Sequence, residues 1–327
     1  MDVTTQAPAS VDDVSRSLAG AGYLADEPAA LVAFLAERLG KPVLVEGPAG
    51  VGKTELAKAI SRSSGRRLVR LQCYEGLDEA KALYEWNYRK QLLRIQLPAG
   101  ASESQRDLSA ASAGAPLPAP SGSGEGRAGA DAWEDIFTEE FLLARPLLEA
   151  ISATEPVVLL IDEIDKTDQE FEAMLLEVLS DFQISIPELG VISAATHPIV
   201  LLTSNNTREL TVALKRRCLY LWLDYPEVER EVEIVRLHAP ELDARLARRL
   251  VEVIHMVRSL DLKKPPSIAE SIDWARALLL LGAADIDRSI FERTMNIIVK
   301  HRSDIDLVAE RVGVKLDGPG VQAGAAG

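Results

Sequence analysis

The sequence is poor in aromatic residues, histidine and cysteine. Phe, Trp and Tyr together make up 5% of the 327 residues, and the four histidines are scattered without a metal-ligand pattern. Cys73 and Cys218 stand far apart and fit neither a metal nor a redox spacing, so we expect reduced thiols. Residues 1–15 lack the basic start and apolar core of a signal peptide, and no apolar run approaches the roughly 20 residues that cross a bilayer. The sequence therefore predicts a soluble, cytoplasmic protein without stable membrane insertion.

Negative charge outnumbers positive charge. The chain has 36 Lys and Arg against 50 Asp and Glu, which gives a net charge of -14. Because nucleic-acid binding requires a basic surface, this balance argues against a nucleic-acid partner, although an acidic chain can still carry a local basic groove. The length suits one large domain or two smaller ones with a packed core.

What the sequence does contain is a phosphate-binding loop at residues 46–54, which read Glu-Gly-Pro-Ala-Gly-Val-Gly-Lys-Thr. It follows a short apolar run and precedes a helical pattern, and it satisfies the G-x-x-x-x-G-K-[ST] motif. Glycines let backbone N–H groups curl around phosphate oxygens, and the following helix points its positive end at them. Lys53 would reach the β- and γ-phosphates, and the hydroxyl of Thr54 would bind Mg²⁺. The expected nucleotide contacts are Gly47, Pro48, Ala49, Gly50, Val51, Gly52, Lys53, Thr54 and Glu55.

A second apolar run, residues 156–161, ends in two carboxylates, Asp162 and Glu163. The run fits a strand buried on both faces of a parallel sheet, and ligands bind at the carboxyl ends of such strands. Asp162 would hold Mg²⁺, and Glu163 would orient or deprotonate the attacking water. An acidic pair in a turn is common and weak evidence alone, but the phosphate loop strengthens it.

Polar and basic residues end or precede two further strands. Residues 199–203 form an apolar run that ends in Ser204, Asn205 and Asn206. An amide there could contact the γ-phosphate or its attacking water, while a turn former or helix cap is the alternative. Arg216 and Arg217 come just before a last strand at residues 219–223, where a surface salt bridge would be the ordinary role.

The order of elements predicts the domain organisation. Alternating strands and helices over residues 21–225 imply an α/β domain with a parallel sheet, and a β-hairpin is expected at residues 182–193. Residues 133–151 read as helical. Residues 226–312 are almost wholly helical, with a capping box at Ser267–Glu270 and a later helix over residues 287–301. We expect flexible ends at residues 1–20 and 313–327, and a disordered insertion rich in Ala, Gly, Ser and Pro at about residues 98–131.

Residues 73–97 concentrate aromatic side chains and end in basic ones. Two interpretations remain open, a helix that packs its rings on the core and a surface element that grips a partner or substrate. The residues concerned are Tyr74, Tyr84, Trp86, Tyr88, Arg89, Lys90 and Arg94.

Over about residues 20–310 the chain resembles AAA+ ATPases in the order of its elements, which are the phosphate loop, the acidic strand end, the strand that ends in Asn, the arginine pair and the helical region. The hairpin before the Asn strand resembles the pre-sensor hairpin clade. Gly47–Thr54 and Ile161–Lys166 are similar to the MoxR branch. Residues 70–80 (Arg-Leu-Gln-Cys-Tyr-Glu-Gly-Leu-Asp-Glu-Ala) and 203–210 resemble the CoxD-like group, which is associated with maturation of molybdenum–copper carbon monoxide dehydrogenase and related molybdenum hydroxylases.

This resemblance implies an AAA+ P-loop fold with a parallel sheet flanked by helices, a small all-α lid, and ATP with Mg²⁺ as ligands. Lys53 and Thr54 match Walker A, while Asp162 and Glu163 match Walker B. The implied activity is that of an ATP-hydrolysing chaperone that remodels a client metalloenzyme.

The resemblance also implies partners. Asn205 matches sensor 1, and Arg217 matches the arginine finger, with Arg216 as the alternative. Because a finger acts on the γ-phosphate of a neighbouring subunit, a homo-oligomeric ring is implied, typically a hexamer. Proteins of this branch commonly work with a von Willebrand factor A domain protein, so such a partner is expected.

One position departs from the family pattern. The sensor 2 arginine lies just after a capping serine, but here the corresponding residue after Ser267 is Ala269, and Arg276 follows about two turns later. Slow hydrolysis, or a nucleotide-gated scaffold that regulates a partner without significant turnover, is therefore the alternative. A DNA-remodelling motor is a further one, against which the acidic balance argues.

Overall fold

The computed structural model describes residues 8–96, 138–187 and 189–316. At its centre is a five-stranded sheet in the order β2-β5-β8-β1-β9, with every pairing parallel. This confirms the expected α/β architecture. The strands are β1 (Val43–Glu46), β2 (Arg67–Gln72), β5 (Val157–Asp162), β8 (Ile199–Ser204) and β9 (Leu219–Trp222).

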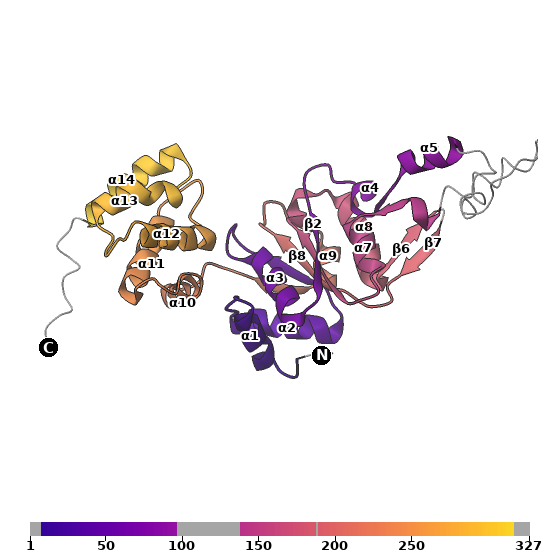
Figure 1. The fold of residues 1–327 in the computed structure, drawn as a ribbon, viewed down its shortest axis with the longest axis horizontal. Coiled ribbons are helices and arrows are strands. Elements are labelled where there is room, and N and C mark those ends of the chain that lie inside the picture. Colours follow the sequence, from indigo (N-terminus) through magenta and orange to yellow (C-terminus); the bar gives the residue numbers. More distant parts are fainter. Residues whose placement is uncertain (1–7, 97–137, 188, 317–327) are drawn as a thin grey trace, which may run out of the picture.

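The sheet is the middle layer between two groups of helices (Figure 1). Successive residues of β5 point to opposite faces, so Val158 and Leu160 pack on one side and Leu159 and Ile161 on the other. All six residues of β5 are buried, which explains its uninterrupted apolar sequence. The first side is covered by α1 (Val11–Gly20), α2 (Glu27–Leu39) and α3 (Lys53–Ser64), and the second by α7 (Pro146–Ile151), α8 (Gln169–Asp181) and α9 (Val212–Arg217).

The expectation of a flexible start over residues 1–20 is wrong for residues 11–20, which form α1. Ser10 caps this helix by accepting a hydrogen bond from the backbone N–H of Asp13 (3.2 Å). Val14 and Leu18, four residues apart, bury one face of α1 in the core. That pair is a short helical signal inside an otherwise polar segment. Residues 1–7 lie outside the described residues.

The expectation of a single helical region over residues 133–151 is also wrong for residues 138–151, the part that the structure describes. Residues 138–151 contain a 3-10 turn (Glu139–Phe141), strand β4 (Leu142–Ala144) and helix α7. Strand β4 pairs antiparallel with β3 (Tyr84–Trp86), so its extended form depends on a partner about 60 residues earlier in the chain. The expected insertion at residues 98–131 lies outside the described residues.

The aromatic segment divides into a buried ring on a strand and exposed rings outside it, so the expected core-packing helix is wrong for Trp86 and a contact with a partner stays a prediction. It contains α4 (Glu79–Ala82), β3 and α5 (Tyr88–Gln96). Trp86 is buried, whereas Tyr74 and Tyr88 are 46% and 63% exposed. The hairpin expected at residues 182–193 is confirmed as β6 (Gln183–Ile186) paired with β7 (Gly190–Ser193).

The helical region after residue 226 has its own core around Trp274 and Phe291. The predicted capping box is confirmed at Ser267 and Glu270. The helix expected over residues 287–301 is shorter than predicted, and the last helix runs to Leu316, past the expected end at residue 312. Residues 317–327 lie outside the described residues. The elements are α10 (Val228–His238), α11 (Ala244–Arg258), α12 (Ile268–Leu280), α13 (Arg288–Thr294), a 3-10 turn (Met295–Ile297) and α14 (Arg302–Leu316).

No helix within the described ranges combines the length and the apolar character needed to cross a membrane.

Candidate nucleotide-binding site

The phosphate loop joins the end of β1 to the start of α3. Gly47 has φ of 152°, and a Cβ at this position would lie 1.9 Å from the backbone oxygen of Leu223, so only glycine fits. The amine of Lys53 donates to the carbonyl oxygens of Gly47 (2.8 Å) and Pro48 (2.7 Å). The lysine is 6% exposed, and this burial lowers its pKa, while the charges of Asp165, Asp162 and Glu163 act in the opposite direction. The loop therefore wraps around a buried amine at the N-terminus of α3.

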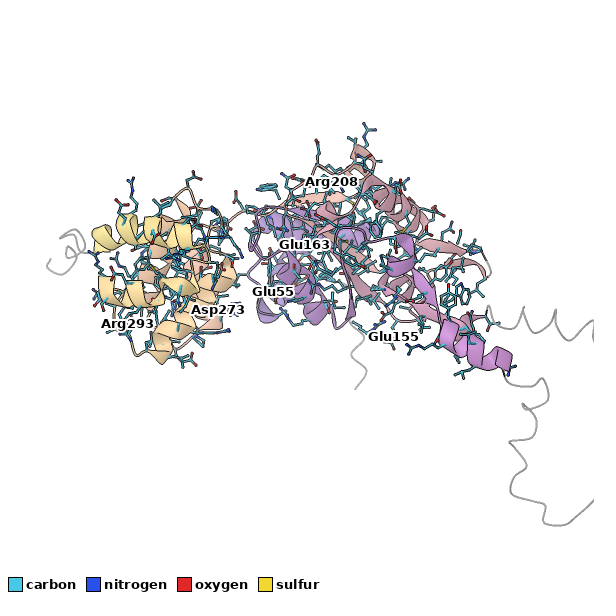
Figure 2. The ribbon with its side chains drawn as sticks, turned by 90° about the horizontal axis from the view of Figure 1, so that it is seen from above. Glu55, Glu155, Glu163, Arg208, Asp273 and Arg293 are labelled. Carbon is cyan, nitrogen blue, oxygen red and sulfur yellow. The ribbon has the colours of Figure 1, made fainter. Side chains whose placement is uncertain are left out.

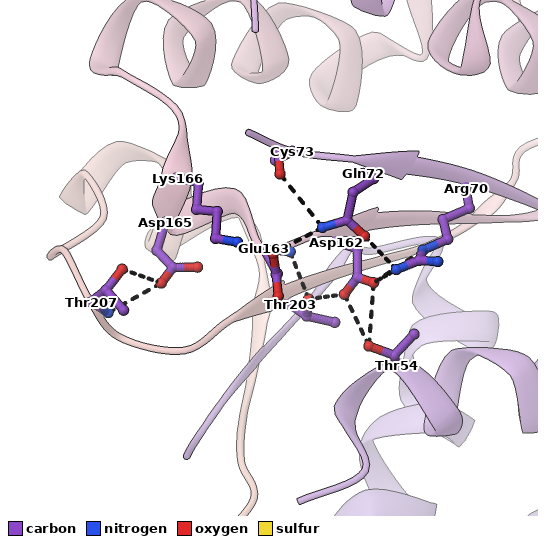
Figure 3. A network of polar contacts seen from close by, with 10 residues as sticks. All are labelled: Thr54, Arg70, Gln72, Cys73, Asp162, Glu163, Asp165, Lys166, Thr203 and Thr207. Atoms are coloured by element: carbon purple, nitrogen blue, oxygen red, sulfur yellow. Dashed lines mark hydrogen bonds and ion pairs between the residues drawn. The ribbon is translucent and has the colours of Figure 1, made fainter. Parts of the chain in front are cut away.

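Asp162 is the centre of the polar network beside this loop (Figure 3). Its Oδ1 accepts hydrogen bonds from the hydroxyls of Thr54 (3.0 Å) and Thr203 (2.5 Å). Its Oδ2 accepts two from the guanidinium of Arg70, at 2.6 Å and 3.1 Å. The structure thus brings together the carboxylate and the hydroxyl that the sequence assigned to Mg²⁺. Carboxylate and hydroxyl oxygens are hard ligands that suit this ion, so the donor set fits it.

Glu163 follows in a strained backbone conformation. Its φ of 61° and ψ of 48° lie in the left-handed region, which costs roughly 1–2 kcal/mol for a residue with a side chain. The backbone N–H of Glu163 donates to the hydroxyl of Thr203 (2.9 Å). Its carboxylate accepts hydrogen bonds from Gln72 Nε2 (2.9 Å) and Lys166 Nζ (2.5 Å). The contact with Glu163 raises the pKa of Lys166. Strain held at such a position is typical of functional sites.

A cavity of about 890 Å³ joins these groups. It is large enough for a small-molecule ligand. Its wall includes most of the residues singled out from the sequence, namely Ala49, Gly50, Val51, Gly52, Lys53, Thr54, Glu55, Asp162, Glu163 and Asn205. In Figure 2, Glu55 and Glu163 lie on the part of the α/β domain that faces the helical region, and Asp273 lies opposite them.

Four residues of the predicted site lie outside this wall: Gly47, Pro48, Arg216 and Arg217. Gly47 and Pro48 contribute instead through the carbonyl oxygens that hold Lys53. Arg216 and Arg217 are exposed at the end of α9. Arg217 donates a hydrogen bond to the hydroxyl of Ser180 on α8. The structure therefore separates this arginine pair from the cavity of its own chain.

Sequence reasoning missed a large part of the cavity wall. Tyr23 precedes α2, Arg230 lies on α10, and Arg276 lies on α12. Arg276 stands seven residues after Ala269, and both line the cavity. The sequence names Arg276 only as an arginine about two turns beyond the sensor 2 position, and because positions i and i+7 share a helix face, that spacing places it on the same side of α12 as Ala269.

The linker between the α/β domain and the helical region also touches the loop. The hydroxyl of Tyr225 donates to the carbonyl oxygen of Ala49 (2.9 Å), and the guanidinium of Arg258 lies 4.3 Å from the centre of the same ring. Arg258 in turn pairs with the fully buried carboxylate of Glu231 through contacts of 2.5 Å and 2.8 Å. A polar chain therefore runs from the core of the helical region to the phosphate loop.

Comparison with known proteins agrees with this geometry. The model of the ATPase family associated with various cellular activities (AAA) matches residues 43–221, more than half of the chain. The chain belongs to the AAA family of ATPases. The match spans β1 to β9. Tyr23, α10 and α12, which also line the cavity of this AAA ATPase, lie outside the matched region.

One similar protein is the gas vesicle ATPase GvpN of Haloferax mediterranei, which is 25% identical over 261 residues. The alignment covers 77% of this AAA ATPase and 65% of GvpN, so the chain spans just under two thirds of that relative's length.

Solved structures of RuvB from Thermotoga maritima are also similar. A point mutant has a TM-score of 0.46 and 17% identity, covering 88% of this chain and 70% of that one. The structure described as a Holliday junction branch migration motor has a TM-score of 0.44 and 17% identity, covering 89% and 72%.

Proposed function

We propose that this protein is a MoxR-type AAA+ chaperone that hydrolyses ATP with Mg²⁺ to remodel a client metalloenzyme. The observation that carries the ATPase part is the convergence of Lys53, Thr54, Asp162, Glu163 and Asn205 on one cavity of about 890 Å³. Lys53 and Thr54 begin α3, which the phosphate loop joins to β1, and Asp162, Glu163 and Asn205 lie at the ends of β5 and β8, so the site gathers at one edge of three neighbouring parallel strands. Ligands bind at this edge of open α/β sheets.

Each side chain has a role that its chemistry supports. Lys53 and the backbone of residues 47–55 would hold the phosphates, and Thr54 and Asp162 would hold Mg²⁺. The ion would supply charge neutralisation of the phosphates. Glu163 would take the proton of the attacking water, and Asn205 would orient that water or the γ-phosphate.

A ring of subunits, typically six, completes the proposed site. Arg217, with Arg216 as the alternative, would reach the γ-phosphate bound by a neighbouring copy. Two observations support this assignment. Both arginines are exposed, and neither lines the cavity of its own chain.

The client and partner are proposed from the sequence. Residues 70–80 and 203–210 resemble the CoxD-like group, so the client would be a molybdenum-containing hydroxylase related to carbon monoxide dehydrogenase. A von Willebrand factor A domain protein would act with the ring. The exposed Tyr74 and Tyr88 and the β6–β7 hairpin supply surface for such contacts. The similarity to GvpN supports the wider ATPase assignment and is silent on the client.

A nucleotide-gated scaffold is the second candidate function. Two observations favour it, Ala269 at the sensor 2 position and the hydrogen bonds that hold Glu163 to Gln72 and Lys166. In this case ATP binding alone would regulate the partner, and wild-type turnover would be undetectable. DNA remodelling is the less favoured alternative because the chain is acidic.

Capture with a hydrolysis-deficient variant tests the proposed function. Glu163→Gln protein with ATP should retain a molybdenum hydroxylase and a von Willebrand factor A domain protein, identified by mass spectrometry. Lys53→Ala protein, which lacks the phosphate-binding amine, is the matched control and should retain neither. Equal capture by both variants, or capture without any molybdenum enzyme, would contradict the proposed client.

A further inference from the structure

Arg70 and Asp162 form an ion pair at the carboxyl edge of the sheet. The guanidinium of Arg70 donates twice to Asp162 Oδ2, at 2.6 Å from Nη2 and 3.1 Å from Nε. The arginine side chain is 47% exposed, whereas the aspartate is 3% exposed. Asp162 is thus a buried carboxylate whose positive partner approaches from the solvent side.

The other donors to Asp162 are two threonine hydroxyls that line the cavity. Its Oδ1 accepts from the hydroxyls of Thr54 (3.0 Å) and Thr203 (2.5 Å), and the Thr54 hydroxyl also lies 3.3 Å from Oδ2, the oxygen that Arg70 contacts. A divalent ion bound through Asp162 would share this carboxylate with a guanidinium. Two cations that contact one carboxylate repel each other, and the repulsion is strong where burial lowers the dielectric constant.

The same guanidinium also reaches the neighbouring carboxylate through one side chain. Arg70 Nη2 donates to Gln72 Oε1, and Gln72 Nε2 donates to Glu163 Oε2 (2.9 Å). Arg70 and Gln72 stand two residues apart on β2, so their side chains share one face of the sheet. Because β2 is hydrogen-bonded to β5, this face lies beside the end of β5. Figure 3 shows the continuous series Asp162, Arg70, Gln72, Glu163 and Lys166.

We propose that Arg70 is a positioning residue that competes with Mg²⁺ for Asp162 and thereby lowers the metal affinity of the site. The inference rests on the proposed binding of Mg²⁺ by Asp162. It adds a residue that none of the phosphate-loop or acidic motifs contains.

A different reading is that Arg70 only stabilises the fold, as a partly exposed ion pair would, typically by 1 kcal/mol or less. The two readings differ in what they predict for the metal. A structural pair changes the melting temperature and leaves the metal affinity as it is. A competing cation changes the metal affinity when it is removed.

Binding of Mn²⁺, followed by electron paramagnetic resonance with ADP at saturation, tests the proposal on the full chain. Removing the competing charge in Arg70→Ala should tighten Mn²⁺ binding on the order of fivefold, the effect of one partly exposed ion pair. Arg70→Lys keeps the charge and should fall between wild type and Arg70→Ala. Arg67→Ala is the matched control, because Arg67 lies on the same strand and pairs with Glu149 instead. It should bind Mn²⁺ as wild type does.

The possible outcomes separate the inference from the function on which it rests. If Arg70→Ala protein with the melting temperature of wild type binds Mn²⁺ as wild type does or more weakly, the inference is wrong and the proposed metal site stands. If Arg70→Ala does not fold, Arg70→Gln provides the uncharged side chain and is read in the same way. If wild type shows no nucleotide-dependent binding of Mn²⁺, the proposed metal site is wrong, and the inference is wrong with it.

Discussion

The backbone N–H of Ile268 donates a hydrogen bond to the carbonyl oxygen of Gly50 (3.1 Å), which joins the first turn of lid helix α12 to the middle of the phosphate loop. The approach is close enough that a Cβ on Gly50 would lie 2.2 Å from the Cβ of Ser267. Since Ser267 is the capping residue of α12, the loop and the lid meet at the one turn whose geometry the capping box fixes.

Gly50→Ala should therefore disturb the loop and the lid together. The new methyl group would clash with Ser267, and the positive φ of 81° adds roughly 1–2 kcal/mol of strain. We expect weaker binding of a fluorescent ATP analogue. Gly76→Ala is the matched control, because Gly76 has a similar φ of 79° with nothing within 4 Å of the added Cβ. Equal nucleotide affinities in the two variants would show that the contact with Ser267 has no role.

The buried ion pair of the lid should dominate its stability. Glu231 is fully buried and accepts hydrogen bonds from Arg258 and from the hydroxyl of Ser271 (2.7 Å). Arg258→Ala removes the guanidinium from this buried carboxylate and leaves it with Ser271 and the His255 ring (3.0 Å), so the unfolding free energy should fall by about 3–5 kcal/mol. Arg248→Ala removes exposed pairs with Glu229 and Glu252 and should cost about 1 kcal/mol or less. Urea denaturation measures both changes, and similar losses in the two variants would contradict the assignment.

Alkaline pH should destabilise the fold through two thiols, of which Cys73 is buried and Cys218 partly buried. Burial, with the charges of Asp162, Asp165 and Glu163, raises the pKa of Cys73 to about 12, and burial raises that of Cys218 to about 12. A thiol in the unfolded chain ionises near pH 8.5, so the unfolded state gains thiolate before the folded state does. The stabilisation is complete below that pH and is lost as the pH rises toward 12.

Cys73→Ala should flatten this dependence. The unfolding free energy of each protein is measured at about pH 8 and about pH 10, and the difference between the two pH values is compared between wild type and variant. The free energy lost with the Cys73 side chain is the same at both pH values, so it cancels in this difference. Wild type should lose more stability over this range than the variant. An equal loss in both proteins would show that Cys73 does not titrate as described.

Mixed rings should reveal whether Arg217 acts between subunits. Arg217→Ala subunits should bind ATP normally but turn it over about 10³–10⁵-fold more slowly. Lys53→Ala subunits should fail to bind nucleotide, yet they carry an intact Arg217. Mixing the two should restore part of the activity, because an Arg217→Ala site would then receive the arginine of its neighbour. Mixed protein that is no faster than either variant alone argues against the finger, and the same series with Arg216→Ala tests the alternative.

The sequence predicts the cavity residues that lie within one continuous motif. Lys53 and Thr54 follow from a loop of fixed spacing, and Asp162 and Glu163 from the end of a strand that is apolar throughout, and all four line the cavity. Arg70 was not found, because its contact with Asp162 follows from the pairing of β2 with β5, which no local pattern specifies.

The same limit explains the errors in the fold. The helix predicted over residues 133–151 does not extend through β4, because the extended form of β4 depends on pairing with β3. Helix α1 was missed because its buried positions, Val14 and Leu18, are few among polar neighbours. Arg230 and Arg276 reach the cavity only because the helical region lies against the phosphate loop, where Ile268 donates to Gly50.

The most direct test of the account is the turnover of Glu163→Gln protein measured together with its ATP affinity. The substitution removes the proposed base and keeps the size of the side chain, so phosphate release should fall by about 10²–10⁴-fold while the affinity for ATP stays at the wild-type value. Glu155→Gln is the control, since Glu155 is an exposed carboxylate just before the opposite end of β5 (Figure 2). It should leave turnover unchanged. Wild-type turnover in the Glu163→Gln protein would contradict the central claim that Glu163 drives hydrolysis.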